Sequence, residues 1–204
     1  MSFLLNSTAT LLTLYLDNCN FGGVLPRFIA NFSHLKDFQL EENIIGGYLP
    51  SEIHLLVNLQ YLDLSENVIG GTIPSSWGGS LQQLIGLYLE GNNLFGEIPI
   101  SLGNLSLLSE LYLQFNELQG PLPVEIGGFK DLVTLNLSNN MFLGTLPTLI
   151  VFIYKQKNKK PLTLDATTEF MPKLSYWDIQ NRAVQRSGSD GSGGRRLQPI
   201  GFRF

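Results

Sequence analysis

The sequence is poor in the residues that build most catalytic and metal centres. It contains one cysteine, Cys19, and two histidines, His34 and His54, among 204 residues. A single cysteine cannot form a disulfide bond within the chain. Neither histidine has a cysteine or a pair of acidic residues near it in the sequence, so we expect no metal site, no cofactor and no catalytic triad. We expect Cys19 to be a buried thiol rather than a reactive group.

Positive charge is scarce in most of the chain. Residues 1–147 hold 13 of the 17 acidic residues and only three basic ones, whereas residues 148–204 carry a net charge of +6. This split separates an acidic domain from a basic tail. The arginines near the end of the tail are too few to indicate a nucleic-acid partner, and we expect none.

One phrase, L-x-L-x-x-N-x-L-x-G-x-[IL]-P, occurs six times. The copies begin at Leu14, Phe38, Leu62, Leu87, Leu111 and Leu135, which are 24 or 25 residues apart. This period and leucine pattern are the signature of a leucine-rich-repeat solenoid. The two apolar residues of L-x-L point to the same side of a short strand. We therefore predict an α/β repeat fold over residues 1–147, a right-handed solenoid with six parallel strands on its concave side.

The other letters of the phrase predict turns. The asparagine should bond the backbone of neighbouring coils, and the next apolar residue should pack inward. The glycine permits a bend and the proline closes the turn. In the first copy Cys19 replaces the asparagine and Phe21 is the inward residue. The segments between copies, such as residues 101–108, should form short helical turns on the convex side.

The Gly-x-[Ile/Leu]-Pro ending, present in all six copies, resembles the plant-specific class of leucine-rich repeat. The resemblance is closest to the ectodomains of plant leucine-rich-repeat receptor-like serine/threonine kinases, and it covers residues 3–147. It implies an extracellular glycoprotein domain of a plasma-membrane receptor that acts in signal transduction. Family members usually close the solenoid with paired cysteines, which this sequence lacks, so its end coils should expose apolar edges. We interpret the chain as a fragment of such a receptor or as a gene model cut short at both ends.

Long apolar runs are missing. Residues 1–5 are too short and lack the basic start of a signal peptide. Residues 146–154 are apolar and a basic cluster follows them, but a membrane helix needs roughly 17–25 residues. We interpret residues 148–160 as a truncated transmembrane segment with its basic stop. The alternative is that this stretch packs on the sixth repeat as a cap.

The kinase motifs of the family are absent. Residues 187–194 are rich in glycine but contain no G-x-G-x-x-G, and neither H-R-D nor D-F-G occurs. We interpret residues 161–204 as a juxtamembrane-like, largely disordered tail. The sequence therefore predicts no enzyme activity, and the label of protein kinase would belong only to the parent receptor.

The outward positions of the predicted strands offer a candidate binding face. Of 24 such positions, eight are acidic, five are aromatic and none is basic. Aromatic residues are enriched where proteins bind partners, and a field of one sign attracts opposite charge, which favours basic peptides as ligands. The alternative is that the acidic residues only keep the solenoid soluble. The expected ligand-binding residues are Tyr15, Asp37, Tyr61, Asp63, Tyr88, Glu90, Glu110, Tyr112 and Phe115.

The family resemblance implies a recognition module. Its expected partners are a peptide ligand or a co-receptor ectodomain, and the membrane would be reached only through the parent receptor. A soluble inhibitor or decoy, as in the polygalacturonase-inhibiting proteins that share this repeat, is the alternative. Four Asn-x-Ser/Thr sequons fit a secreted ancestry. They lie at Asn6, Asn31, Asn104 and Asn136.

Overall fold

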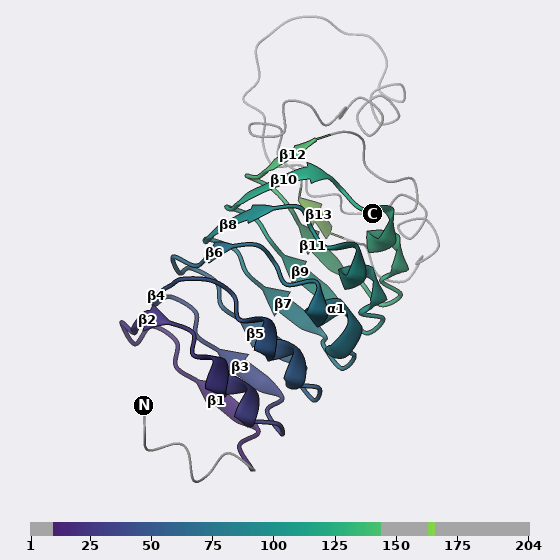
Figure 1. The fold of residues 1–204 in the computed structure, drawn as a ribbon. Helices are drawn as coiled ribbons and strands as arrows, with labels where there is room; N and C mark the ends of the chain where they lie inside the picture. The colour runs from purple at the N-terminus through teal and green to yellow at the C-terminus, as the bar shows by residue number, and fades with distance from the viewer. Residues whose placement is uncertain (1–9, 144–162, 166–204) are drawn as a thin grey trace, which may run out of the picture.

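A computed structural model describes residues 10–143 and 163–165 of the chain. These residues wind into a solenoid of stacked coils, with strands on one side and short helical turns on the other (Figure 1). The predicted repeat fold is confirmed. Asn6, the segment 148–160 and nearly all of the tail 161–204 lie outside the described residues.

One parallel sheet runs along the solenoid in the strand order β1-β3-β5-β7-β9-β11-β13. Each of its first six strands begins one residue before a predicted Leu-x-Leu segment, so the six predicted strands are confirmed. The seventh, which comes from the tail, was not predicted. The bounds are β1 Thr13–Tyr15, β3 Asp37–Gln39, β5 Tyr61–Asp63, β7 Gly86–Tyr88, β9 Glu110–Tyr112, β11 Thr134–Asn136 and β13 Thr163–Asp165.

A second row of short strands follows the asparagine column, which the sequence did not predict. In the first five repeats the glycine of the phrase lies in or beside these strands with a positive φ, for example 72° at Gly47 and 81° at Gly71. A Cβ at Gly47 would also lie 2.7 Å from Val24 Cγ1, so the bend predicted at glycine is required both by conformation and by space. The bounds are β2 Gly22–Val24, β4 Ile44–Gly46, β6 Gly70–Gly71, β8 Asn93–Gly96, β10 Glu117–Pro121 and β12 Met141–Leu143.

The convex side consists of short helical turns, as expected, which begin one residue after the repeat proline or, for the turn of the third repeat, two residues after it. Proline suits this place because the first N–H groups of a helix have no partner within it. The third repeat is one residue longer than the others, and it forms an α-helical turn instead of a 3₁₀ turn. The bounds are η2 Arg27–Asn31, η3 Ser51–Leu55, α1 Ser76–Ser80, η4 Ile100–Asn104 and η5 Val124–Gly128.

The buried leucines form one continuous core, and the asparagine column joins the coils at its edge. The side-chain amide of Asn92 donates to the carbonyl of Leu64 in the preceding coil at 2.9 Å, and its oxygen accepts from the N–H of Ile69 at 2.9 Å. The predicted ladder is confirmed, because the same two bonds to the preceding coil recur along the column. They are made by Asn43, Asn67, Asn116 and Asn140.

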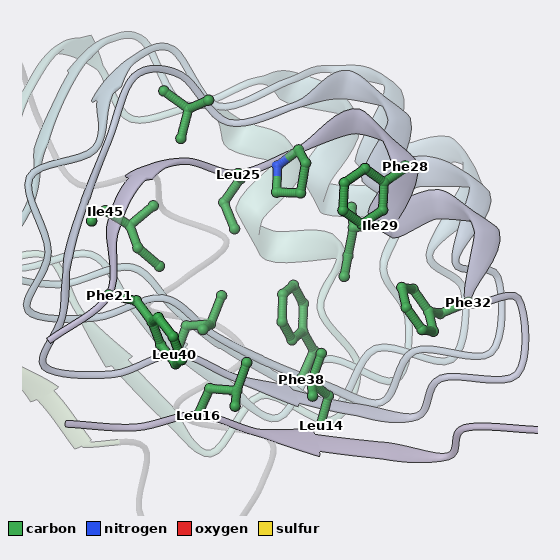
Figure 2. A pocket seen from close by; sticks show the side chains of 13 residues that line it. Leu14, Leu16, Phe21, Leu25, Phe28, Ile29, Phe32, Phe38, Leu40 and Ile45 are labelled. Atoms are coloured by element: carbon green, nitrogen blue, oxygen red, sulfur yellow. The ribbon is translucent and has the colours of Figure 1, made fainter. Parts of the chain in front are cut away.

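The first coil differs from two sequence predictions. Cys19 is exposed rather than buried, and Phe21 is 39% exposed rather than packed inward. The reason is that β1 is the edge strand of the sheet, and a solenoid buries side chains only between neighbouring coils. Apolar side chains of the first two coils, among them Leu14 and Leu16, line an open pocket at this end (Figure 2). The expected apolar edge is therefore present at the first coil.

Candidate ligand-binding face

The concave face is formed by the outward side chains of the parallel sheet and of the turn that follows each strand. Successive residues of a strand point to opposite sides, so the inward leucines of the repeat leave their neighbours facing out. The predicted ligand-binding residues are distributed along this face from the first coil to the fifth. They are Tyr15 on β1, Asp37 on β3, Tyr61 and Asp63 on β5, Tyr88 on β7, Glu110 and Tyr112 on β9, with Glu90 and Phe115 in the following turns.

The centre of the face contains a pair of stacked tyrosines. Tyr88 and Tyr112 are directly opposite in the register of β7 and β9, and their ring centroids are 5.4 Å apart with 23° between the ring planes. The Tyr88 hydroxyl donates a hydrogen bond to Oε2 of Glu110 at 2.5 Å. Burial, and then this hydrogen bond, raise the pKa of Tyr88 far above its usual value, so the phenol stays protonated.

Gly86 is a site residue that the sequence analysis missed. A Cβ at this position would lie 2.7 Å from Cε2 of Tyr88 and 2.9 Å from Cδ1 of Tyr61. Both rings therefore cover Gly86, and Tyr61, Tyr88 and Tyr112 form one aromatic cluster. A glycine inside a strand is the signal that could have indicated such a close approach.

Glu90 lies beside the aromatic cluster with an unusual carboxyl group. Burial raises its pKa to about 7, and the negative charges of Asp63, Glu41 and Glu66 act in the same direction. Its Oε2 atom is buried and has no hydrogen-bond partner among the described residues, and the same holds for Oε1 of Gln114 in the next coil. Glu90 therefore exchanges its proton near neutral pH.

Two other acidic residues of the face, Asp63 and Asp37, accept hydrogen bonds from neighbouring side chains. Burial raises the pKa of Asp63, while hydrogen bonds from the N–H and the hydroxyl of Ser65, at 3.0 and 2.6 Å, act against this shift. Asp37 accepts a hydrogen bond of 2.6 Å from the Tyr15 hydroxyl, which raises the pKa of Tyr15. The Tyr15–Asp37 pair lies on the first two coils and is separate from the central cluster.

Phe115 has an unusual backbone. Its φ is 55°, in the left-handed region that bulky residues rarely adopt, and its side chain is 58% exposed. Positive φ is a property of this position in every described coil, where it comes directly before the residue of the asparagine column. The fold therefore imposes the conformation, and it turns the Phe115 ring toward solvent.

The acidic residues of the face have no cationic partners among the residues that the structure describes. The ion pair recorded there joins Arg27 to Glu52 at 2.8 Å on the convex side. Within the same residues, no group of three His, Cys, Asp or Glu side chains could hold a metal ion. The face can therefore offer a partner negative charge, hydrogen-bond acceptors and aromatic surface.

The sequons lie in different environments. Asn31 and Asn104 are exposed at the ends of convex turns. Asn136 lies on β11, half-buried, and its side-chain oxygen accepts hydrogen bonds from the N–H and the hydroxyl of Ser138 at 3.1 and 2.9 Å. A glycan at Asn136 would stand on the concave face.

Comparison with known families agrees with this geometry. A leucine-rich-repeat family model matches residues 9–69, and a second leucine-rich-repeat model matches residues 83–105 and 131–152. No curated protein sequence matches the chain. In the part of the chain that the structure describes, no helix has the length and apolar character needed to span a membrane.

Several solved structures are similar to the chain. The plant peptide hormone receptor RGFR1 in complex with RGF2 is 31% identical with a TM-score of 0.65, and the match covers 72% of this chain and 23% of that one. The Arabidopsis receptor kinase HAESA, solved with the peptide hormone IDA and the co-receptor SERK1, is 31% identical over 70% of this chain and 28% of its own, with a TM-score of 0.54. The chain thus spans about a quarter of these receptor chains.

A third structure matches over most of its own length. Pollen Receptor Kinase 3 is 30% identical with a TM-score of 0.67, and the match covers 76% of this chain and 72% of that one. The sequence repeats, the two rows of strands and these relatives all indicate the same leucine-rich-repeat fold. The chain belongs to the leucine-rich-repeat family of plant receptor-kinase ectodomains.

Proposed function

We propose that the chain is a recognition module that binds a basic, extended peptide, or a basic segment of a co-receptor ectodomain, on its concave face. The observation that carries this proposal is the aromatic cluster of Tyr61, Tyr88 and Tyr112 beside carboxyl groups that have no cationic partner among the described residues. Aromatic rings provide contact area at low entropic cost, and the acidic residues of the face attract Lys and Arg side chains. The complex of the peptide hormone receptor RGFR1 with RGF2, and that of HAESA with a peptide hormone and a co-receptor, support a peptide or a co-receptor as the class of partner.

The dimensions of the face suit a short peptide. Strands about 4.8 Å apart give the six repeat strands a width of roughly 24 Å. An extended peptide advances about 3.3 Å per residue, so roughly seven residues would cross the face. Tyr88 and Tyr112 lie near the middle of this path, where anchor residues of an interface usually contribute most.

Synthetic octapeptides of graded net charge provide the test, and the strongest binder would then be titrated by calorimetry. Basic octapeptides should bind and acidic ones should not, with affinity that falls as salt rises. Tyr88→Ala or Tyr112→Ala should weaken binding about tenfold or more. The matched control is Tyr48→Ala, because Tyr48 is 74% exposed and follows β4, away from the concave face.

Other outcomes would contradict the proposal. If Tyr88→Ala and Tyr112→Ala bind as the parent does while Tyr48→Ala fails, the ligand uses another face. The acidic residues would then serve only solubility. The proposed role involves no chemistry, so the purified chain should not transfer phosphate from ATP; autophosphorylation free of contaminating kinase would overturn this part.

A further inference from the structure

The concave sheet ends in a strand from the tail. β13 pairs with β11 in parallel, with Thr163, Leu164 and Asp165 opposite Thr134, Leu135 and Asn136 (Figure 1). This register places Leu164 opposite Leu135, which is itself opposite Leu111. β13 therefore occupies the place that the strand of a seventh repeat would take.

The sequence around β13 is compatible with this place. Leu164 follows Leu135 by 29 residues, at the upper end of the 20–29 range for leucine-rich repeats. The other letters of the repeat phrase do not follow Leu164, which explains why the sequence pattern did not reveal it.

We propose that Thr163–Asp165 is the terminal strand of the receptor-like domain and closes the C-terminal edge of the concave sheet. Without it, β11 would present unpaired N–H and C=O groups, which are prone to pair with another chain. The segment Thr163–Asp165 of the chain itself pairs with the edge of β11. This inference does not depend on the ligand proposed above.

The pairing has a consequence for membrane topology. Two strands of one sheet must lie in the same compartment, so the chain would have to leave and return between β12 and β13 if it entered a membrane there. Only residues 144–162 connect these strands, fewer than the roughly 20 residues of one helical span. A membrane crossing at residues 148–160 and the pairing of β13 with β11 therefore exclude each other. The hydrogen-bonded register favours the same compartment for β13 and the repeats.

Cysteine cross-linking in the full chain tests the strand pairing. Neighbouring strands are about 4.8 Å apart, within the Cα separation that a disulfide bond spans. In a Cys19→Ser background, Thr134→Cys with Thr163→Cys should lose both free thiols on mild oxidation. Glu110→Cys with Thr134→Cys joins two register partners of β9 and β11 and is the positive control. Thr134→Cys with Asp165→Cys is two residues out of register and should keep its thiols.

The outcomes are distinct. Oxidation of the Thr134–Thr163 pair to the extent of the positive control supports the terminal strand. Free thiols at the level of the out-of-register pair, while the positive control oxidises, overturn it.

A glycan assay tests the topology in plant cells, with a secretory signal sequence placed before the full chain. Ser187→Asn creates an Asn-Gly-Ser sequon in the tail. A gain of one glycan relative to the parent chain supports a tail on the side of the repeats. If Asn104 carries its glycan and position 187 does not, the tail has crossed the membrane and the proposal is wrong.

Discussion

The first and the fourth coil carry the same repeat phrase but differ in burial. Leu87 and Leu89 of the fourth coil have no exposed surface, whereas Leu14 and Leu16 of the first coil are only partly buried. The fourth coil lies between two neighbours, and the first coil lies at the edge of the sheet. The comparison shows that a repeat residue is buried by the adjacent coils rather than by its own coil.

The asparagine column shows the same asymmetry in its hydrogen bonds. Each asparagine of the ladder forms hydrogen bonds with the backbone of the preceding coil. Asn43, for example, accepts from the N–H groups of Cys19 and Phe21 at 3.2 and 2.9 Å. Cys19 stands in the column but has no amide, and its thiol donates to the carbonyl of Asp17 in its own coil at 3.2 Å. Within the described residues, the ladder therefore begins at Asn43.

The largest expected effect is the loss of stability when a core leucine is truncated in the fourth coil rather than in the first. Leu87→Ala should lower the free energy of unfolding by about 2–5 kcal/mol, because it leaves a cavity between two packed coils. Leu14→Ala should cost less than half as much, since part of the side chain already contacts solvent. Denaturant titration of both variants measures the difference, and equal losses would mean that the first coil is covered as well as the fourth.

The next effect tests the ladder inside one coil. Asn92→Ala should lower the free energy of unfolding by about 1–3 kcal/mol, because buried backbone groups such as the Leu64 carbonyl lose their partner. Asn93→Ala is the matched control, as its side chain is exposed at the start of β8. Urea titration should find it nearly neutral, and equal losses at the two positions would contradict the ladder.

The sequence predicted the parts of the fold that repeat with a strong period. The six leucine strands and the asparagine ladder follow from spacing alone. The even-numbered strands of the second row, β2 through β12, were missed because their glycines indicate bends rather than strands. β13 was missed because only one leucine of the phrase remains in register after a longer interval.

The candidate face was predicted in composition but not in detail. The repeat spacing predicts that Tyr88 and Tyr112 occupy the same position in adjacent coils, and in the structure their rings are stacked. The role of Gly86 could have been suspected from a glycine inside a strand, although not which rings cover it. The raised pKa of Glu90 depends on which side chains bury its carboxyl group, and no local pattern encodes this. The exposure of Cys19 and Phe21 was missed for the same reason, because burial at a solenoid end is decided by a neighbouring coil.

A third effect compares Glu90 in the fourth coil with a carboxylate off the concave face. The pKa of Glu90 is about 7 in the folded chain and near 4.5 when unfolded. Between these values the folded state binds more protons, so the free energy of unfolding falls as pH rises toward 7. Glu90→Gln removes this loss and should stabilise the chain at pH 8 by on the order of 1–2 kcal/mol, reduced for partial exposure, and by little at pH 4.5.

Urea titrations at the two pH values measure the change for Glu90→Gln. Glu117→Gln is the control, because Glu117 is exposed on β10 and carries the same charge. Its effect should be small at both pH values. A gain for Glu90→Gln that does not change with pH would show that its carboxyl group ionises normally.

The smallest expected effect is that of Cys19→Asn, and Asn43→Cys at the next position of the asparagine column is its counterpart. Asn43→Cys should destabilise the chain by about 1–3 kcal/mol, because the N–H groups of Cys19 and Phe21 lose their acceptor. Cys19→Asn adds an amide at the edge coil, where no described coil precedes it and the nearby acceptors are carbonyls of its own coil, such as that of Asp17. It should change the free energy of unfolding by less than about 0.5 kcal/mol, as surface substitutions usually do. Thermal and urea unfolding of both variants provide the measurement. A gain of 1 kcal/mol or more from Cys19→Asn would show that a segment before Thr10 packs on the first coil and extends the ladder by one step.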